Sequence, residues 1–169
     1  MNLDYVKLRD NVQDLEFATD HSACFDIRSN FTPDIEGYSP HNLRKIFNAE
    51  DLDDGSSGIL LMPGERLKVP TGLVFNLPVG YSLRIHPRSG LAWKRGLRLA
   101  NGEGVIDADY HLEVFVLLHN ASGGNVWVKD NERICQGEMV KMLDYTLNPV
   151  YNIKHHESVR TGGFGSTGV

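Results

Sequence analysis

Short runs of β-forming residues dominate the hydrophobic pattern of this chain. Over residues 81–86, apolar and polar side chains alternate strictly, with Tyr81, Leu83 and Ile85 on one face. This period of two predicts a half-buried strand whose second face carries polar groups. Residues 113–118 form an almost continuous apolar run instead, which predicts a strand buried between two layers.

Turn residues divide much of the remaining chain into further short strands. Glycine, proline and serine punctuate it at residues 63–64, 78–80 and 122–124. The pattern also predicts strands over the following ranges: residues 66–69, 73–77, 125–128 and 138–143. Many short strands separated in this way indicate an all-β fold of the sandwich, jelly-roll or barrel type.

A polar, acidic stretch at about residues 34–58 interrupts the strand pattern. Inside it, a possible N-cap, a first-turn proline and an apolar stripe at helical spacing follow one another. The residues that carry this pattern are Ser39, Pro40, Leu43, Ile46 and Phe47. We therefore predict an insertion with a short helix, and not a second domain.

Composition limits the classes of function. A chain of 169 residues with 41% hydrophobic and 23% charged residues is typical of one soluble domain. A net charge of −5 argues against binding to a nucleic acid polymer, although a few arginines in a cleft can still hold a nucleotide. No signal peptide is apparent, and no window approaches the roughly 20 apolar residues of a membrane span, so we expect a cytoplasmic protein.

Cys24 and Cys135 are the only cysteines, and each lies in an apolar run. We expect two buried free thiols in a reducing compartment. Two cysteines without paired histidines at ligand spacing predict no structural zinc site.

Candidate chemistry begins where the strand at residues 81–86 ends. Arg88 and Ser89 follow it, and then a helical segment at residues 91–95 with Gly96 as its expected C-cap. Backbone N–H groups at a helix start, a hydroxyl and a guanidinium can together hold phosphate. A simple cap with a surface charge is the alternative interpretation.

Residues 101–110 form a predicted hairpin that runs into two aspartates and a tyrosine. Asp107 and Asp109 share a face in extended geometry, with Tyr110 opposite unless the strand bends. One carboxylate in this position can polarise a water while the ring packs on a sugar. An acidic hairpin tip without a catalytic role explains the pattern equally well.

Two segments near the carboxyl terminus carry the remaining candidates. In an extended segment at residues 133–136, Arg133 and Cys135 share one face, and Gln136 lies on the other, where it can donate to phosphate. The last ten residues, 160–169, hold four glycines. They form either a flexible tail or a mobile lid over a ligand.

Five segments occur in a fixed order along the chain: Ala23-Cys24-Phe25-Asp26-Ile27, Pro87-Arg88-Ser89-Gly90-Leu91-Ala92, Gly104-Val105-Ile106-Asp107-Ala108-Asp109-Tyr110, Arg133-Ile134-Cys135-Gln136 and Gly162-Gly163-Phe164-Gly165-Ser166-Thr167-Gly168. Together they resemble the five ordered motifs of the homotrimeric dUTPase family. The resemblance extends from about Ser22 to the carboxyl terminus, apart from the insertion.

This resemblance implies a jelly-roll-like β-barrel that assembles as a homotrimer with active sites at the subunit interfaces. It also implies hydrolysis of dUTP to dUMP and pyrophosphate with Mg²⁺. Residues 1–159 would form the barrel domain with its insertion, and residues 160–169 would close over the ligand as a glycine-rich lid.

The same resemblance implies roles for single residues. Asp107 would orient and deprotonate the water that attacks the α-phosphorus, and Tyr110 would lie under the deoxyribose and exclude a 2′-hydroxyl. Asp26 would reach Mg²⁺ only through water. The implied contacts to the phosphates are Arg88, Ser89, Gly90, Gln136, Arg160, Gly165, Ser166 and Thr167. The implied contacts to uracil are Asn101, Gly104, Val105 and Ile106, with Phe164 stacked on the base.

Some positions depart from the family pattern. Cys24 stands where the family usually has glycine, and Leu112 where a glycine commonly follows the tyrosine. Asn131 occupies a turn position that is often glycine, and asparagine adopts the left-handed conformation readily. The insertion is either structural padding at a trimer edge or a docking surface for a protein partner.

Two other functions fit parts of the pattern. A dCTP deaminase of the same fold, or a bifunctional form, would share the Arg88-Ser89 region. Its hairpin runs Ile-Asp-Pro-Gly-Trp, however, whereas residues 106–110 here differ, and Glu113 is a weak candidate for the glutamate that deamination requires. The second alternative is a regulatory binding module on a dUTPase scaffold.

Overall fold

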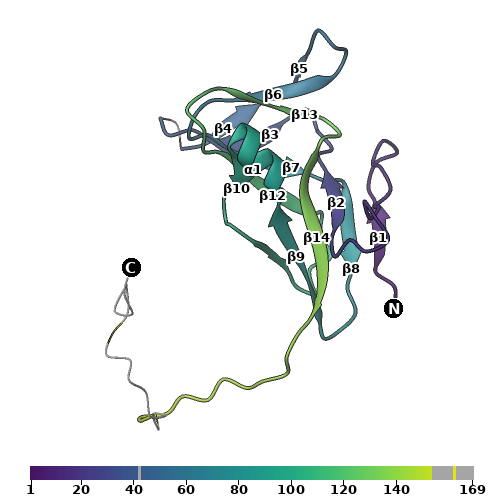
Figure 1. Cartoon of the computed structure of the whole chain (residues 1–169), viewed down its shortest axis with the longest axis vertical. Coiled ribbons are helices and arrows are strands. Elements are labelled where there is room, and N and C mark those ends of the chain that lie inside the picture. The colour runs from purple at the N-terminus through teal and green to yellow at the C-terminus, as the bar shows by residue number, and fades with distance from the viewer. Residues whose placement is uncertain (42, 154–161, 163–169) are drawn as a thin grey trace.

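The computed structural model describes residues 1–41, 43–153 and 162, and within these residues the chain forms fourteen β-strands and one short α-helix (Figure 1). The helix, α1 (Ser89–Arg95), is seven residues long. With seven residues, α1 is too short for a membrane span, and the described residues contain no other helix.

Two larger sheets form the centre of the fold. The first has the strand order β10-β12-β7-β3-β4. Its strands are Leu97–Leu99, Phe115–Asn120, Arg66–Pro70, Ile35–Tyr38 and Lys45–Phe47. The second has the order β11-β9-β14-β2. Its strands are Gly104–Ile106, Tyr81–Pro87, Arg133–Lys141 and Phe25–Arg28.

Two smaller sheets complete the arrangement. In one, β1 (Asp4–Lys7) pairs with β8 (Leu73–Asn76). In the other, the order is β13 (Val126–Lys129), β6 (Ser57–Leu61) and β5 (Glu50–Asp51). The strand pairs in all four sheets are antiparallel, and many join segments far apart in sequence. This is the jelly-roll-like, all-β architecture that the sequence predicts.

The core is built from alternate residues of the central strands. Leu67 and Val69 of β7 and Leu83 and Ile85 of β9 are each at most 3% exposed. Removal of such side chains from water is the main favourable contribution to folding. The alternation predicted for β9 is confirmed, except that Ser82, expected on the polar face, is also buried.

The predicted helix in the insertion is wrong. Residues 35–38 and 45–47 form the hairpin strands β3 and β4, which extend the five-stranded sheet through the pairing of β3 with β7. Only Phe47 of the apolar stripe is buried, at 4%, whereas Leu43 and Ile46 are 80% and 48% exposed. The spacing of these residues fits helix and strand alike over so short a range, and pairing with β7 decides the outcome.

The expectation of a strand buried on both faces at residues 113–118 is also wrong for the single chain. The strand is β12, and Val116 and Leu118 are buried, but Phe115 and Leu117 are 36% and 41% exposed. The apolar side chains on one face of this strand therefore stay exposed to solvent in the single chain. The other predicted strands are confirmed within a few residues as β7, β8, β13 and β14.

Asn131 is the one residue other than glycine with a positive φ among the described residues, at 57°. The left-handed backbone expected for this position is confirmed. It forms the turn between β13 and β14 and thereby sets the start of β14.

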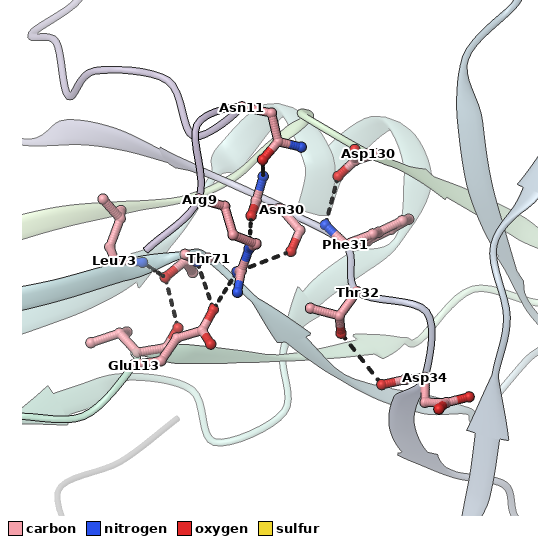
Figure 2. Close-up of polar contacts among 12 residues, drawn as sticks. Arg9, Asn11, Asn30, Phe31, Thr32, Asp34, Thr71, Leu73, Glu113 and Asp130 are labelled. Atoms are coloured by element: carbon pink, nitrogen blue, oxygen red, sulfur yellow. Dashed lines mark hydrogen bonds and ion pairs between the residues drawn. The ribbon is translucent and has the colours of Figure 1, made fainter. Parts of the chain in front are cut away.

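A polar network ties the amino-terminal segment to the body of the protein (Figure 2). Nη2 of Arg9 lies 2.6 Å from Oε1 of Glu113, and this oxygen also accepts a 2.7 Å hydrogen bond from the backbone N–H of Gly72. Gly72 has a φ of 70°, and a Cβ there would lie 2.3 Å from Val12. Glycine is therefore required at this position, and Oε1 of Glu113 is held by two structural contacts.

Glu65 links the insertion to the body of the protein, and its replacement should destabilise the fold. It is 1% exposed, Nζ of Lys45 lies 2.9 Å from its Oε1, and the N–H of Met62 donates to its Oε2 at 2.9 Å. Glu65→Ala leaves both donors without their acceptor, so we expect a loss of about 3 kcal/mol in the free energy of unfolding. Urea denaturation at one fixed protein concentration measures this loss.

Glu36→Ala is the matched control for this prediction. Glu36 is a carboxylate of the same insertion that pairs with Arg44 and Lys68 at the surface. Exposed pairs contribute little, so the unfolding midpoint should hardly move. Equal midpoints for the two variants would show that Glu65 does not anchor the insertion.

Candidate functional site

One cleft collects residues from three of the motifs found in the sequence. It has a volume of about 510 Å³ and is lined by residues that precede or belong to β2, by α1 and the residue before it, and by β14. The predicted site residues in its lining are Asp26, Arg88, Ser89, Gly90 and Gln136. The structure therefore brings together segments that lie more than 100 positions apart in the chain.

Asp26 and two arginines form the polar centre of this cleft. Nε of Arg88 lies 3.0 Å from Oδ1 of Asp26, and Nη1 of Arg133 donates to Oδ2 at 3.1 Å. Arg88 also donates through Nη1 to the carbonyl oxygen of Arg133 at 3.0 Å. These contacts fix the Arg88 guanidinium while more than a quarter of its side chain, 27%, stays exposed to solvent.

The cleft is basic, although the chain as a whole is acidic. Four basic side chains and one carboxylate are found among its lining residues; the basic ones are Arg88, Lys94, Arg95 and Arg133. Arg95 is paired with Glu132. The remaining excess of positive charge attracts an anion with several charges, such as a chain of phosphates.

Helix α1 adds backbone donors and one side chain that the sequence analysis missed. Ala92 donates the first helical hydrogen bond, to the carbonyl of Arg88 at 3.0 Å, so the preceding N–H groups have no acceptor within the helix. The helix ends at Gly96, with a φ of 65°, as predicted. Lys94 lies one turn after Gly90 on the same side, and this i, i+4 spacing was the signal available in the sequence.

A bulge in β14 corrects the predicted arrangement of residues 133–136. The pairing of β14 with β2 shifts between Arg133 and Cys135. Ile134 and Cys135 are consequently both buried, and Arg133 and Gln136 both reach the cleft. Cys135 therefore does not share a face with Arg133, because one extra residue in the strand changes the alternation.

The hairpin residues lie elsewhere in the single chain. Gly104, Val105 and Ile106 form β11, which pairs with β9. Asp107 follows at its end and is exposed, and Tyr110 is held by a 2.9 Å hydrogen bond from its hydroxyl to the carbonyl of Glu113.

The register of this pairing separates Asp107 from the cleft. Ile106 pairs with Leu83, so Asp107 follows next to Ser82, at the far end of β9 from Arg88. Six residues of strand correspond to about 20 Å. Asp107 and Arg88 of one chain therefore cannot contact the same phosphate group.

Asn101 lies in the turn before β11 and lines a different hollow, of about 480 Å³. This hollow also contains Tyr38 and Arg44 of the insertion and Leu117 of β12. Five further predicted residues lie outside the described part of the chain: Arg160, Phe164, Gly165, Ser166 and Thr167.

Both cysteines are free thiols, as expected. Cys135 is fully buried, and burial raises the pKa of its thiol. Cys24 is only half-buried, which differs from the expectation, and it lines the cleft beside Asp26.

Comparison with known proteins identifies the family. A family model described as dUTPase matches residues 55–168. The deoxyuridine 5′-triphosphate nucleotidohydrolase of Nautilia profundicola is 38% identical over 122 residues, which are 72% of this chain and 82% of that protein. The chain belongs to the dUTPase family. The enzyme of the same name from Brucella melitensis biotype 1 is 42% identical over 111 residues, or 65% of this chain and 69% of the relative.

Solved structures of dUTPases have the same fold. The dUTPase of Staphylococcus bacteriophage 80alpha with dUPNHPP matches with a TM-score of 0.75 at 21% identity, over 99% of both chains. The dUTPase of phage phi11 of S. aureus, a structure that visualises a species-specific insert, matches with a TM-score of 0.70 at 18% identity over 92% of this chain and all of that one.

Proposed function

We propose that this dUTPase-family protein hydrolyses dUTP to dUMP and pyrophosphate. The observation that carries this proposal is the meeting of Asp26, Arg88, Ser89 and Gln136 in one basic cleft of a chain that belongs to this family. A triphosphate is the substrate group that such a cleft fits best, because several fixed donors and cations converge on one small space.

The active site is proposed to form between copies of the chain in a homotrimer. Asp107 lies about 20 Å from Arg88 along β9 in the same chain, so the carboxylate that acts on a phosphate bound at Arg88 must come from a second copy. The apolar side chains left exposed are consistent with coverage by other copies. These are Val105, Tyr110, Leu112, Phe115 and Leu117.

The segment after β14 supports the same assembly. Residues 142–153 have no regular structure and lead away from the body of the protein (Figure 1). They carry apolar side chains that are largely exposed, among them Leu143 at 86% and Leu147 at 89%. Such a segment gains stability only when a partner surface covers it, and it would carry the glycine-rich lid to a neighbouring subunit.

Catalysis is proposed to divide between the two sides of this shared site. Arg88, Ser89, Gln136 and the N–H groups at the start of α1 hold the triphosphate and neutralise its charge. Asp107 of the neighbouring copy accepts a proton from the attacking water, which adds to the α-phosphorus while pyrophosphate leaves from the opposite side. The β11 backbone and Asn101 recognise uracil, and Tyr110 excludes a 2′-hydroxyl.

The surroundings of Asp26 fit an indirect role toward Mg²⁺. Each carboxylate oxygen of Asp26 already contacts one guanidinium, of Arg88 or Arg133, which disfavours direct coordination of a metal ion. A contact through water is compatible with both pairs, because its side chain is still 18% exposed. Mg²⁺ bound by triphosphate oxygens would neutralise charge and fix the conformation of the phosphates.

The described structure gives little support to a deaminase. Glu113, the candidate acid for deamination, binds Arg9 and the N–H of Gly72, and it does not line the basic cleft. If Glu113 moved into a base-binding site, it would lose its contacts with Arg9 and Gly72, and these contacts hold the amino-terminal segment in place.

A docking role for the insertion stays a prediction. The insertion is part of two sheets, so deletion of residues 38–57 would remove β4 and β5 and disturb the fold. Replacement of exposed Leu43 and Ile46 by serine is the better test, because these side chains are outside the core. A cytoplasmic location likewise stays a prediction, consistent with action on the nucleotide pool.

The substrate range tests the proposed function directly. We expect pyrophosphate release from dUTP to exceed that from dTTP, dCTP and UTP by at least about 100-fold in kcat/KM, and to require Mg²⁺. Parallel measurement of ammonia separates the rival enzyme class. Ammonia release from dCTP at a rate comparable to dUTP cleavage would establish a deaminase instead.

Removal of the carboxyl-terminal residues tests the lid. A chain truncated before Gly162 should lose activity on the order of 10²-fold, because the bound triphosphate is no longer enclosed and positioned. Light scattering after size-exclusion chromatography should still report a trimer. Dissociation of the truncated protein into monomers would show that the tail is architectural.

A further inference from the structure

Two neighbouring strands and the residue that precedes a third place possible metal ligands together on one face of a sheet. In Figure 1, β2, β14 and β9 lie side by side, and their register pairs Gln136 with both Asp26 and His86. The β2 pairing ends with Gly137 opposite Phe25, and its continuation by one residue puts Cys24 opposite Glu138. His86 is then the diagonal neighbour of Glu138 on the same face, a separation that long side chains bridge.

The side chains do converge in this way. One ligand atom from each of Cys24, His86 and Glu138 lies within 4.8 Å of the other two. Nε2 of His86 is 3.3 Å from Oε2 of Glu138. Around a tetrahedral zinc ion, bond lengths of about 2.0–2.1 Å to nitrogen and oxygen give an N···O separation of about 3.3 Å. Small side-chain rotations would bring the sulfur into place.

The imidazole of His86 is oriented as a metal ligand commonly is. Its Nε2 is shielded from solvent, and its 3.3 Å contact with Glu138 lacks hydrogen-bond geometry, so within residues 1–41, 43–153 and 162 it makes no hydrogen bond. Its Nδ1 lies 3.6 Å from Oε1 of Glu103 on the other side of the ring. A carboxylate behind a histidine is a recurrent support for metal-binding imidazoles, since it fixes the ring and raises its basicity.

From this geometry we propose that Cys24, His86 and Glu138 form a binding site for a zinc-type divalent transition metal, with a fourth position open to water. Sulfur and imidazole ligands select such ions over Mg²⁺, so this site is distinct from magnesium bound to the triphosphate. Cys24 and Asp26 both line the basic cleft. The metal would therefore lie beside the part of the cleft that is proposed to bind the phosphates. The sequence predicts no zinc site because the three ligands lie far apart along the chain, at the residue before β2, in β9 and in β14.

Cobalt titration of the full-length protein, freed of metal and without nucleotide, tests this inference. We expect about one Co²⁺ per chain, with the visible absorption of tetrahedral cobalt and a thiolate-to-cobalt charge-transfer band. Zn²⁺ should displace the cobalt, and excess Mg²⁺ should not. Cys24→Ser should abolish the charge-transfer band, and His86→Ala should weaken binding more than about 100-fold.

Matched variants separate this site from adventitious binding. Cys135→Ala and His111→Ala remove the other thiol and an exposed histidine and should leave the titration unchanged. Glu103→Gln keeps all three ligands and should weaken cobalt binding by about 10–100-fold. Circular dichroism of each variant checks that it is folded.

Two results would overturn the inference. One is cobalt binding without a charge-transfer band in the wild-type protein. The other is equal affinity in the wild type and in folded Cys24→Ser. Either would mean that His86 merely pairs with Glu103 and Glu138. Because the titration contains no nucleotide, it is independent of whether dUTP is the substrate.

Discussion

Asp107→Asn is expected to lower the turnover of dUTP by about 10²–10⁴-fold while folding, assembly and nucleotide binding persist. An amide has nearly the shape of the carboxylate but cannot accept the proton of the attacking water. Because Asp107 is exposed in the single chain, its replacement removes no packing interaction. Steady-state pyrophosphate release and equilibrium binding of a non-hydrolysable dUTP analogue measure the two effects separately.

Asp109→Asn is the matched control for this experiment. It removes a carboxylate two positions away in the same turn, and Asp109 is also exposed. We expect turnover within a few fold of the wild type. Unimpaired hydrolysis by Asp107→Asn would show that another group is the general base.

Arg88→Ala is expected to reduce kcat/KM for dUTP by about 10²–10³-fold, because a fixed cation in the phosphate cleft is lost. Asp26 keeps its contact with Arg133 in this variant, so the cleft should not collapse. Arg98→Ala on β10 is the control, since Arg98 is exposed and does not line the cleft. Equal losses in the two variants would indicate general electrostatics and not a defined contact.

The fold was largely predictable because its strands are short and sharply patterned. The alternation over β9 identifies its buried face, with Leu83 and Ile85 in the core. The insertion was mispredicted because Ser39, Pro40 and the apolar residues after them satisfy helical spacing over a single turn. Pairing of β3 with β7, a contact between distant segments, overrides such a local preference.

The site was predictable residue by residue only through its family resemblance. No local pattern indicates that Asp26, Arg88 and Gln136 meet, since β2, β9 and β14 become neighbours only in the folded sheet. The bulge after Arg133 could not be predicted for a similar reason, because strict alternation of the two strand faces assumes that no extra residue interrupts the strand. Lys94 was visible as a helical neighbour of Gly90, but its contribution to the cleft depends on the position of the whole helix.

We propose that phosphate binding and proton transfer belong to different copies of the chain. Mixing of inactive Arg88→Ala and Asp107→Asn proteins, followed by joint unfolding and refolding, tests this division. If each site combines Arg88 of one copy with Asp107 of another, random equimolar assembly should restore about one quarter of wild-type activity. Continued inactivity of properly assembled mixed trimers would contradict the shared site.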